Sequence, residues 1–259
     1  MKKPVKIFFI VLITLSVILN LMLAKEGSIK TSLGQSLVLM MMFVPTISYI
    51  VTRFICKSQV GKVKLRFGKI KAIILAYLLP FIYVSITYGI IWCFGFYKGN
   101  FDVTLLLIGL AGTIVNVMAT IGEEIGWRGF LLDEFLKTKS PLAATISVGL
   151  IWSLWHIPGL IFTDYGNTVN LIYGIPFFVI SLTMLSIPMS YFVLKANNIW
   201  PAILMHASHN ALIQAVYETM TIGNTQSAFL KDETGLILML LTLSLGLFFA
   251  FKLKKLQFT

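Results

Sequence analysis

Charged side chains are scarce in this sequence. Asp, Glu, Lys and Arg make up 12% of its 259 residues, whereas an average soluble domain has about 25%. Apolar residues make up 58%, and the mean hydropathy is +0.89. A chain so poor in charge and so rich in apolar side chains is neither disordered nor an ordinary cytosolic enzyme. The composition predicts a polytopic membrane protein.

Cysteines and acidic residues are also few. Cys56 and Cys93 cannot make a disulfide framework or a four-ligand zinc site. Ten acidic residues against 21 lysines and arginines give a net charge of +11. In a soluble protein this excess would indicate nucleic-acid binding, but in a membrane protein it marks the cytoplasmic loops. No nucleic-acid partner is expected.

The apolar residues form runs long enough to cross a membrane, which takes about 20 residues in a helix. Eight spans are predicted, at residues 7–24, 36–55, 72–96, 103–136, 141–160, 171–194, 199–217 and 235–251. The expected fold is therefore all-α, a polytopic membrane helix bundle of about eight transmembrane helices. Nothing marks a separate soluble domain, so residues 1–259 are expected to form a single membrane-embedded domain.

Basic residues are divided unevenly between the two sides of these spans. With a cytoplasmic N-terminus, 17 of the 21 lysines and arginines fall on the cytoplasmic side. The four on the other side are Lys25, Lys30, Lys98 and Lys231. The positive-inside rule therefore predicts a multi-pass protein of the cell membrane with both termini in the cytoplasm. Residues 57–71, which mix basic and apolar side chains, are expected to lie on anionic lipid headgroups.

Ionisable groups inside a span are costly and therefore mark candidate functional positions. In the span 103–136, polar residues recur at steps of three and four, on one face of a helix: Thr113, Asn116, Thr120, Glu124 and Arg128. Glu124 and Arg128 are an i, i+4 pair with the acid first. Burial would make their mutual neutralisation almost obligatory.

The neighbouring acid is placed differently on the same helix. Glu123 is turned by about 100° from Glu124, so that Arg128 reaches it less readily. The pair thus divides into a structural acid, Glu124, and a freer acid, Glu123, which suits a general base. The alternative interpretation is that both glutamates lie at the membrane interface, at the end of a helix, where Arg128 offsets their negative charge. Gly122 and Gly126 are expected to let another helix approach closely.

All three histidines of the chain fall within predicted spans. His156 lies one helical turn after Trp152, whose ring can hold the imidazole. His206 and Asn210 are spaced i, i+4 and point into one cavity, with His209 beside them. A single histidine in a helix is more often a packing residue, but three at membrane depth beside a glutamate pair favour a functional site.

Depth in the membrane is an independent test of whether these residues meet. With a rise of about 1.5 Å per residue, Glu123 and His156 lie about 20 and 22 Å from the cytoplasmic face. They meet only if the helix of 103–136 continues past its glutamates, as its polar stripe predicts. Ser140 and Pro141 are expected to be the N-cap and first residue of the following helix.

Three motifs, taken together, resemble the Abi family, also called the CPBP family, of CAAX proteases and bacteriocin-processing enzymes. They are Glu123-Glu124-x-x-x-Arg128, Trp152-x-x-x-His156 and His206-x-x-x-Asn210. Their order and spacing are those of the family, and the chain is most similar to its bacterial branch, related to type II CAAX prenyl endopeptidases. One departure is visible, because the family usually has Phe where this chain has Trp152.

The resemblance implies an intramembrane endopeptidase built on an eight-helix bundle, with its catalytic core at about residues 103–217. Glu123 would activate the hydrolytic water, and His156 would help to hold and polarise it. His206 and Asn210 would stabilise the tetrahedral oxyanion. The supporting residues that order the site would be Glu124, Arg128 and Trp152.

A metal-dependent mechanism is the alternative, since the family has also been described as metalloproteases. Glu123, His156 and His206 would then coordinate Zn²⁺ and leave one open position. The sequence contains neither His-Glu-x-x-His nor a cysteine ligand cluster. A mechanism without a cofactor is therefore preferred, with zinc as the alternative.

Two other classes of function stay open. A non-catalytic protein of the same fold would sequester a peptide or confer bacteriocin self-immunity, and a proton-coupled transporter would use buried Glu and His as relays. The full set of candidate catalytic residues argues against binding alone, and the absence of an inverted repeat argues against transport. The expected partners are membrane lipid and a substrate, either a prenylated CAAX protein, a leader or pheromone peptide, or a membrane-protein segment.

Overall fold

The computed structural model describes residues 2–57, 59–99, 104–165 and 170–255. Its α-helices are α1 (Lys3–Glu26), α2 (Ser32–Ile55), α3 (Ile70–Ile91), α4 (Thr104–Gly126), α5 (Leu132–Leu136), α6 (Pro141–Phe162), α7 (Leu171–Ala196), α8 (Trp200–Asn210), α9 (Thr225–Leu230) and α10 (Leu236–Lys254). Three π-helical segments, Trp92–Phe96, Trp127–Leu131 and Ala211–Tyr217, and the 3₁₀ turn Glu218–Met220 extend them. The described residues form no strand beyond one isolated bridge, Tyr97 to Thr221, so the predicted all-α bundle is confirmed.

Seven helices of the described part are long and apolar enough to cross a membrane. They are Lys3–Glu26, Ser32–Ile55, Ile70–Phe96, Leu107–Leu136, Pro141–Phe162, Leu171–Ala196 and Leu236–Lys254. Seven of the eight predicted spans correspond to these helices. The remaining range, 199–217, is also helical, as α8 and the π-helical segment after it, but it is not one of the seven.

The position of α8 explains this difference. It packs against α3, α4 and α7, and nearly all of its side chains are buried. Polar residues such as His206 and Asn210 interrupt its apolar surface. A helix that is enclosed by other helices does not need the continuous apolar surface that lipid contact requires. The range 199–217 therefore forms the polar interior of the bundle.

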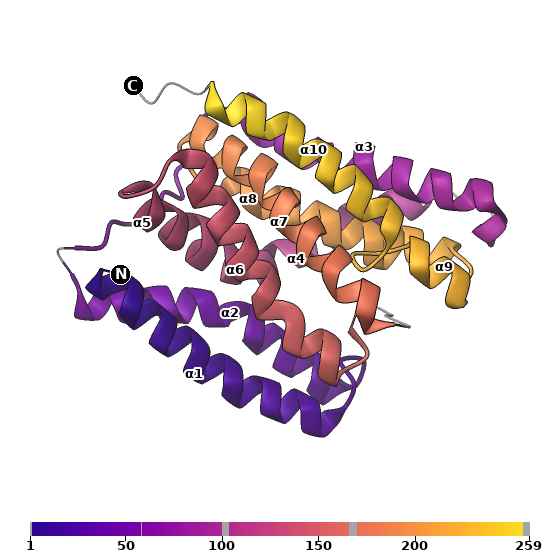
Figure 1. The fold of residues 1–259 in the computed structure, drawn as a ribbon, viewed down its shortest axis with the longest axis horizontal. Coiled ribbons are helices and arrows are strands. Elements are labelled where there is room, and N and C mark those ends of the chain that lie inside the picture. The colour runs from indigo at the N-terminus through magenta and orange to yellow at the C-terminus, as the bar shows by residue number, and fades with distance from the viewer. Residues whose placement is uncertain (1, 58, 100–103, 166–169, 256–259) are drawn as a thin grey trace.

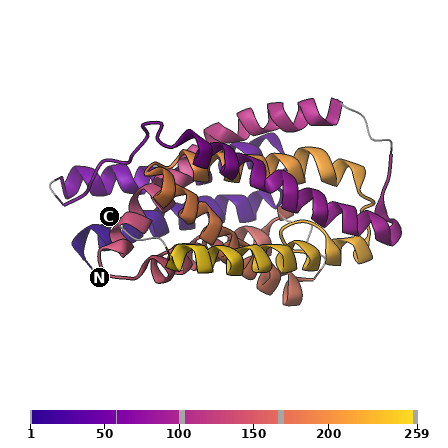
Figure 2. The ribbon, with the colours of Figure 1, turned by 90° about the horizontal axis from the view of Figure 1, so that it is seen from above.

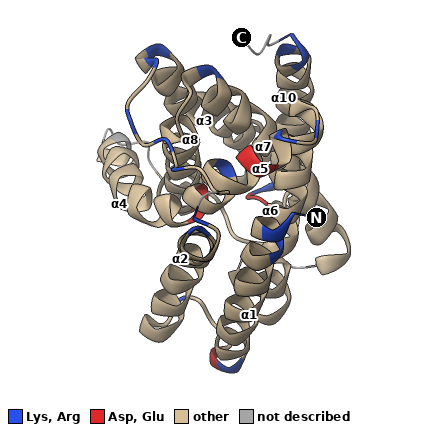
Figure 3. Cartoon of the chain, turned by 90° about the vertical axis from the view of Figure 1, so that its left-hand side faces the viewer, with Lys and Arg blue, Asp and Glu red and all other residues tan. Residues whose placement is uncertain are grey.

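Both termini lie at the same end of the bundle, as Figures 1 and 2 show. Figure 3 looks onto this end, and segments that carry lysine and arginine gather there. The loop between α2 and α3 belongs to this end and is fixed to the α7–α8 turn. There the amide of Ile199 donates to the carbonyl of Lys64 over 3.2 Å, and the indole of Trp200 donates to the carbonyl of Leu65 over 2.7 Å. Which side of the membrane this end faces stays a prediction.

The helix that carries the glutamates continues past them, as the depth argument requires. α4 passes into the π-helical segment Trp127–Leu131 and then into α5, which ends at Leu136. The next helix, α6, begins as expected, because the Ser140 side chain accepts a hydrogen bond from the amide of Ala143 and Pro141 is its first residue. The sequence therefore correctly predicts both helices around this turn.

The predicted close approach of a helix at Gly122 and Gly126 is confirmed. α4 crosses α2 at these two glycines. A Cβ atom at Gly122 would lie 2.7 Å from the carbonyl oxygen of Met42, and one at Gly126 would lie 2.4 Å from Cβ of Pro45. The first atom is backbone and the second belongs to a rigid proline, so neither can move aside. These glycines set the distance at which α2 covers the glutamate-bearing part of α4.

We expect Gly126→Ala to destabilise the protein by about 1–3 kcal/mol, because the added methyl overpacks the contact with Pro45. The measurement is the thermal unfolding midpoint of the detergent-purified protein. Gly89→Ala in α3 is the matched control, because a Cβ there meets no heavy atom of the described residues within 4 Å apart from its chain neighbours and the backbone of its own helix. Equal midpoints for the two variants would contradict the proposed close packing of α2 on α4.

Candidate active site

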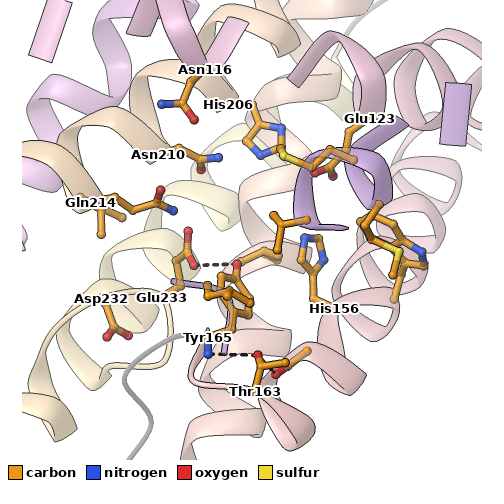
Figure 4. Close-up of a pocket in the computed structure, with 18 of the residues that line it drawn as sticks. Asn116, Glu123, His156, Thr163, Tyr165, His206, Asn210, Gln214, Asp232 and Glu233 are labelled. Atoms are coloured by element: carbon orange, nitrogen blue, oxygen red, sulfur yellow. Dashed lines mark hydrogen bonds between the residues drawn. The ribbon is translucent and has the colours of Figure 1, made fainter. Parts of the chain in front are cut away.

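A cavity of about 350 Å³ lies inside the bundle, among α1, α2, α4, α6, α8 and the loops at one end (Figure 4). The four residues that the resemblance implicates in catalysis all line it: Glu123, His156, His206 and Asn210. They come from α4, α6 and α8. The fold therefore brings together all the residues that the three motifs predicted to meet.

Glu123 is almost fully buried, with 1% of its surface exposed. Its Oε2 atom accepts hydrogen bonds from the indole nitrogens of Trp152, at 2.7 Å, and Trp127, at 3.3 Å. Two donors on one carboxylate oxygen fix the orientation of the whole group. Trp127 follows Glu123 by one helical turn, whereas Trp152 comes from another helix, so only the first contact is local in sequence.

Glu124 and Arg128 form the predicted ion pair, with both side chains completely enclosed. Nη1 of Arg128 donates to both carboxylate oxygens of Glu124, over 2.8 and 3.0 Å. Nδ1 of His206 lies 3.0 Å from Oε1 of the same carboxylate. Because a carboxylate only accepts hydrogen bonds, Nδ1 carries the proton and Nε2 is the nitrogen left for the cavity. The prediction of Glu124 as the structurally paired acid agrees with this geometry.

His156 is held in a similar way by a backbone group. Its Nδ1 donates to the carbonyl oxygen of Trp152 over 2.8 Å. The ring packs among aromatic side chains, including Trp155 at 4.9 Å and Phe178 at 5.6 Å between ring centroids. A neutral imidazole that donates through Nδ1 has its lone pair on Nε2. His156 can therefore accept a hydrogen bond from a water molecule in the cavity.

Two side-chain amides line the cavity on the side of His206. Asn210 is 9% exposed and lies one turn after His206 on α8. Figure 4 shows it between Asn116 and Gln214, beside His206. Asn116 donates to the carbonyl of Gly112 over 2.9 Å and also lines the cavity. Amide N–H groups on one wall are suitable donors for a developing oxyanion.

The sequence analysis missed one part of the site. Glu233, in the short loop before α10, lines the cavity and has its Oε1 3.4 Å from Nε2 of His209. The hydroxyl of Tyr165 donates to Oε2 of Glu233 over 3.1 Å, and the hydroxyl of Tyr83 lies 2.7 Å from Nδ1 of His209. Loops have no helical periodicity that could predict which side chains face a cavity. The one signal in the sequence was the adjacent pair Asp232-Glu233, which is notable because the whole chain has only ten acidic residues.

The two loop acids differ in how they hold a proton. Burial raises the pKa of Glu233, but the contact with His209 and the hydrogen bond from Tyr165 outweigh burial, and the pKa lies below its ordinary value. Burial raises the pKa of Asp232 well above its ordinary value, against hydrogen bonds from Thr234. Glu233 is therefore the charged partner of His209, and Asp232 keeps its proton more readily.

The motif residues at the cavity also have the chemistry of metal ligands. The chemistry of Glu123, His156 and His206 suits zinc, since each imidazole is oriented through Nδ1 and presents Nε2. Within the described residues, however, no group of three or more His, Cys, Asp or Glu is placed to share one ion.

The fold and the cavity define a polytopic helical membrane protein with an acid–histidine site buried inside the bundle. Residues 103–212 match the family model described as type II CAAX prenyl endopeptidase Rce1-like. The chain is also 33% identical over 116 residues to CAAX prenyl protease 2 of Methanococcus maripaludis, which covers 42% of this chain and 39% of that protein. The central segment of the chain is thus similar to the CAAX protease family, and the predicted resemblance is confirmed. Outside it the two proteins are not aligned, so this chain matches about two fifths of its relative's length.

We expect Glu124→Gln and Arg128→Ala each to lower the amount of folded protein in the membrane. Each leaves a buried charge without its partner, at a cost of about 3–5 kcal/mol. Glu123→Gln keeps the volume and an oxygen that accepts the two indole N–H groups, so it should accumulate normally. Immunoblots of membrane fractions, with unfolding midpoints for purified protein, provide the measurement. Indistinguishable behaviour of the three variants would show that the two acids do not have separate roles.

Proposed function

We propose that this protein is an intramembrane endopeptidase that hydrolyses a peptide bond in a membrane-associated protein or peptide. The observation that supports it is the meeting of Glu123, His156 and His206 with Asn210 at one cavity within the bundle. Hydrolysis of an amide needs a base, an oriented water and donors aimed at the oxyanion. Each of these requirements has a candidate residue on the cavity wall.

In the proposed reaction, a water lies between the Glu123 carboxylate and Nε2 of His156. The water oxygen bonds to the peptide carbonyl carbon while its proton passes to Glu123. With Oε2 held by two indoles, we assign Oε1 as the oxygen that takes this proton. The C–N bond then breaks, and Glu123 returns the proton to the departing amine. The products are a carboxylic acid and an amine, and Glu123 is restored.

The opposite wall would stabilise the negative charge on the tetrahedral intermediate. The Asn210 amide donates to the oxyanion, and His206 does the same through Nε2–H when its ring carries both protons. Nδ1–H of His206 stays on Glu124 throughout, and Arg128 keeps Glu124 in place. Membrane lipid and a peptide or prenylated protein are the partners that this function implies.

We expect Glu123→Gln to abolish cleavage, because it removes the base but not the packing. The measurement is a comparison of all membrane and secreted peptides between wild-type cells and cells with the variant. New peptide termini that depend on Glu123 are the expected result. The matched control is Glu26→Gln at the end of α1, outside the cavity lining, which should leave the same termini intact. Self-immunity that persists unchanged in the Glu123→Gln strain would instead favour a binding protein.

Purified enzyme separates the metal-free mechanism from zinc. In the metal-free case Asn210→Ala should lower turnover by about 10²–10³, since it removes an oxyanion donor. A strong chelator should leave the wild-type activity intact. Activity that is lost on chelation, restored by added Zn²⁺ and proportional to zinc content would overturn this mechanism. Glu123 would then be a metal ligand, and Glu124 the first candidate for the base.

A further inference from the structure

The cavity extends to the surface at one end of the bundle, where its lining residue Lys30 is exposed. Beyond His156 its lining continues through Thr163 and Asp164, which follow α6, to Lys30 in the α1–α2 turn. Glu233 lines the same outer part. These residues lie on turns at the end of the bundle opposite to the two termini (Figure 1). Figure 4 shows Thr163 and Tyr165 below the catalytic residues.

The rim of the opening is built from polar groups. Asp164 accepts hydrogen bonds from the Ser28 hydroxyl and the Ile29 amide, both over 2.8 Å. Nζ of Lys30 lies 3.7 Å from the same carboxylate, and the Lys30 side chain is 69% exposed. These contacts join the α1–α2 turn to the end of α6 across one side of the mouth. Such a rim is typical of a surface in contact with water.

Packed side chains close the cavity toward the other end. Trp127 and Leu131 are 0% exposed, and Arg128 is 2% exposed. A second hollow lies at the basic end, bounded by lysines such as Lys62 and Lys139. The two hollows share no lining residue. In the described part of the chain, these packed side chains therefore separate the basic end from the cavity that holds Glu123.

We propose that the substrate bond lies in a peptide segment on the non-cytoplasmic side of the membrane. Two observations together give this side: the cavity reaches the surface at the end opposite the termini, and 17 of the 21 basic residues mark the terminal end as cytoplasmic. The substrate class is thus a leader or secreted peptide, or an extracytoplasmic segment of a membrane protein. A prenylated C-terminus held at the cytoplasmic leaflet would face the closed end. This inference rests on the proposed peptidase function.

Cysteine labelling tests the side of the opening without any substrate. In a background of Cys56→Ser and Cys93→Ser, Lys30→Cys places a thiol at the rim, and Lys139→Cys places a matched thiol on the exposed surface of the basic end. A membrane-impermeant maleimide added to intact cells should label Lys30→Cys and should label Lys139→Cys only after permeabilisation. The reverse pattern would overturn the inference, whatever the protein's activity.

Mapping of cleavage sites tests the substrate class itself. Peptide termini that depend on Glu123 should fall in segments outside the cytoplasm. These termini should be at least tenfold less abundant in the Glu123→Gln strain than in the wild type. Glu123-dependent termini confined to cytoplasmic segments would leave the peptidase function standing and overturn the inferred side. If no terminus depends on Glu123, the proposed function fails, and the inference about its substrates fails with it.

Discussion

The ion pair between Glu124 and Arg128 is the interaction on which the geometry of the site depends. Both side chains are fully enclosed in the bundle, where either charge alone would be costly. Mutual neutralisation allows α4 to continue past the glutamates through the membrane interior. Glu123 precedes this pair by one residue and is held by indole N–H groups instead of a guanidinium. Two adjacent acids thereby acquire different chemical surroundings.

Trp152 connects the separate parts of this arrangement. The Arg128 guanidinium stacks over its ring at 4.3 Å from the centroid, and its indole N–H donates to Glu123. Its backbone carbonyl holds His156, and its ring meets the His206 ring edge-on at 5.2 Å. A phenylalanine at this position would keep the ring contacts and lose the hydrogen bond to Glu123. The departure from the family motif is therefore more than a change of aromatic support, because it adds a donor to the proposed base.

The predictions from sequence succeeded where the relevant contacts lie within one helix. The pair of Glu124 with Arg128 and the common wall of His206 and Asn210 both follow from i, i+4 spacing. The bond from Trp152 to Glu123 joins α6 to α4 and depends on how each helix is rotated, which periodicity does not give. Glu233 was missed because a short loop has no periodicity at all. The range 199–217 was predicted as a span from its length, while its polar residues already pointed to an interior position.

Helical spacing no longer predicts which residues share a face once a helix departs from α-helical geometry. Two of the three helices that carry paired motif residues change to π-helix within or directly after the motif, at Trp127–Leu131 and at Ala211–Tyr217. An i→i+5 pattern adds a residue to the turn and shifts the face of all that follows, and such segments are common at functional sites. The first of them also carries Gly129, where a Cβ would lie 2.8 Å from Cγ1 of Val63 in the basic loop. The α2–α3 loop, which is hydrogen-bonded to the α7–α8 turn, thus also packs on the π-helical segment Trp127–Leu131. The basic end of the bundle therefore supports the packed side chains that lie between it and the cavity.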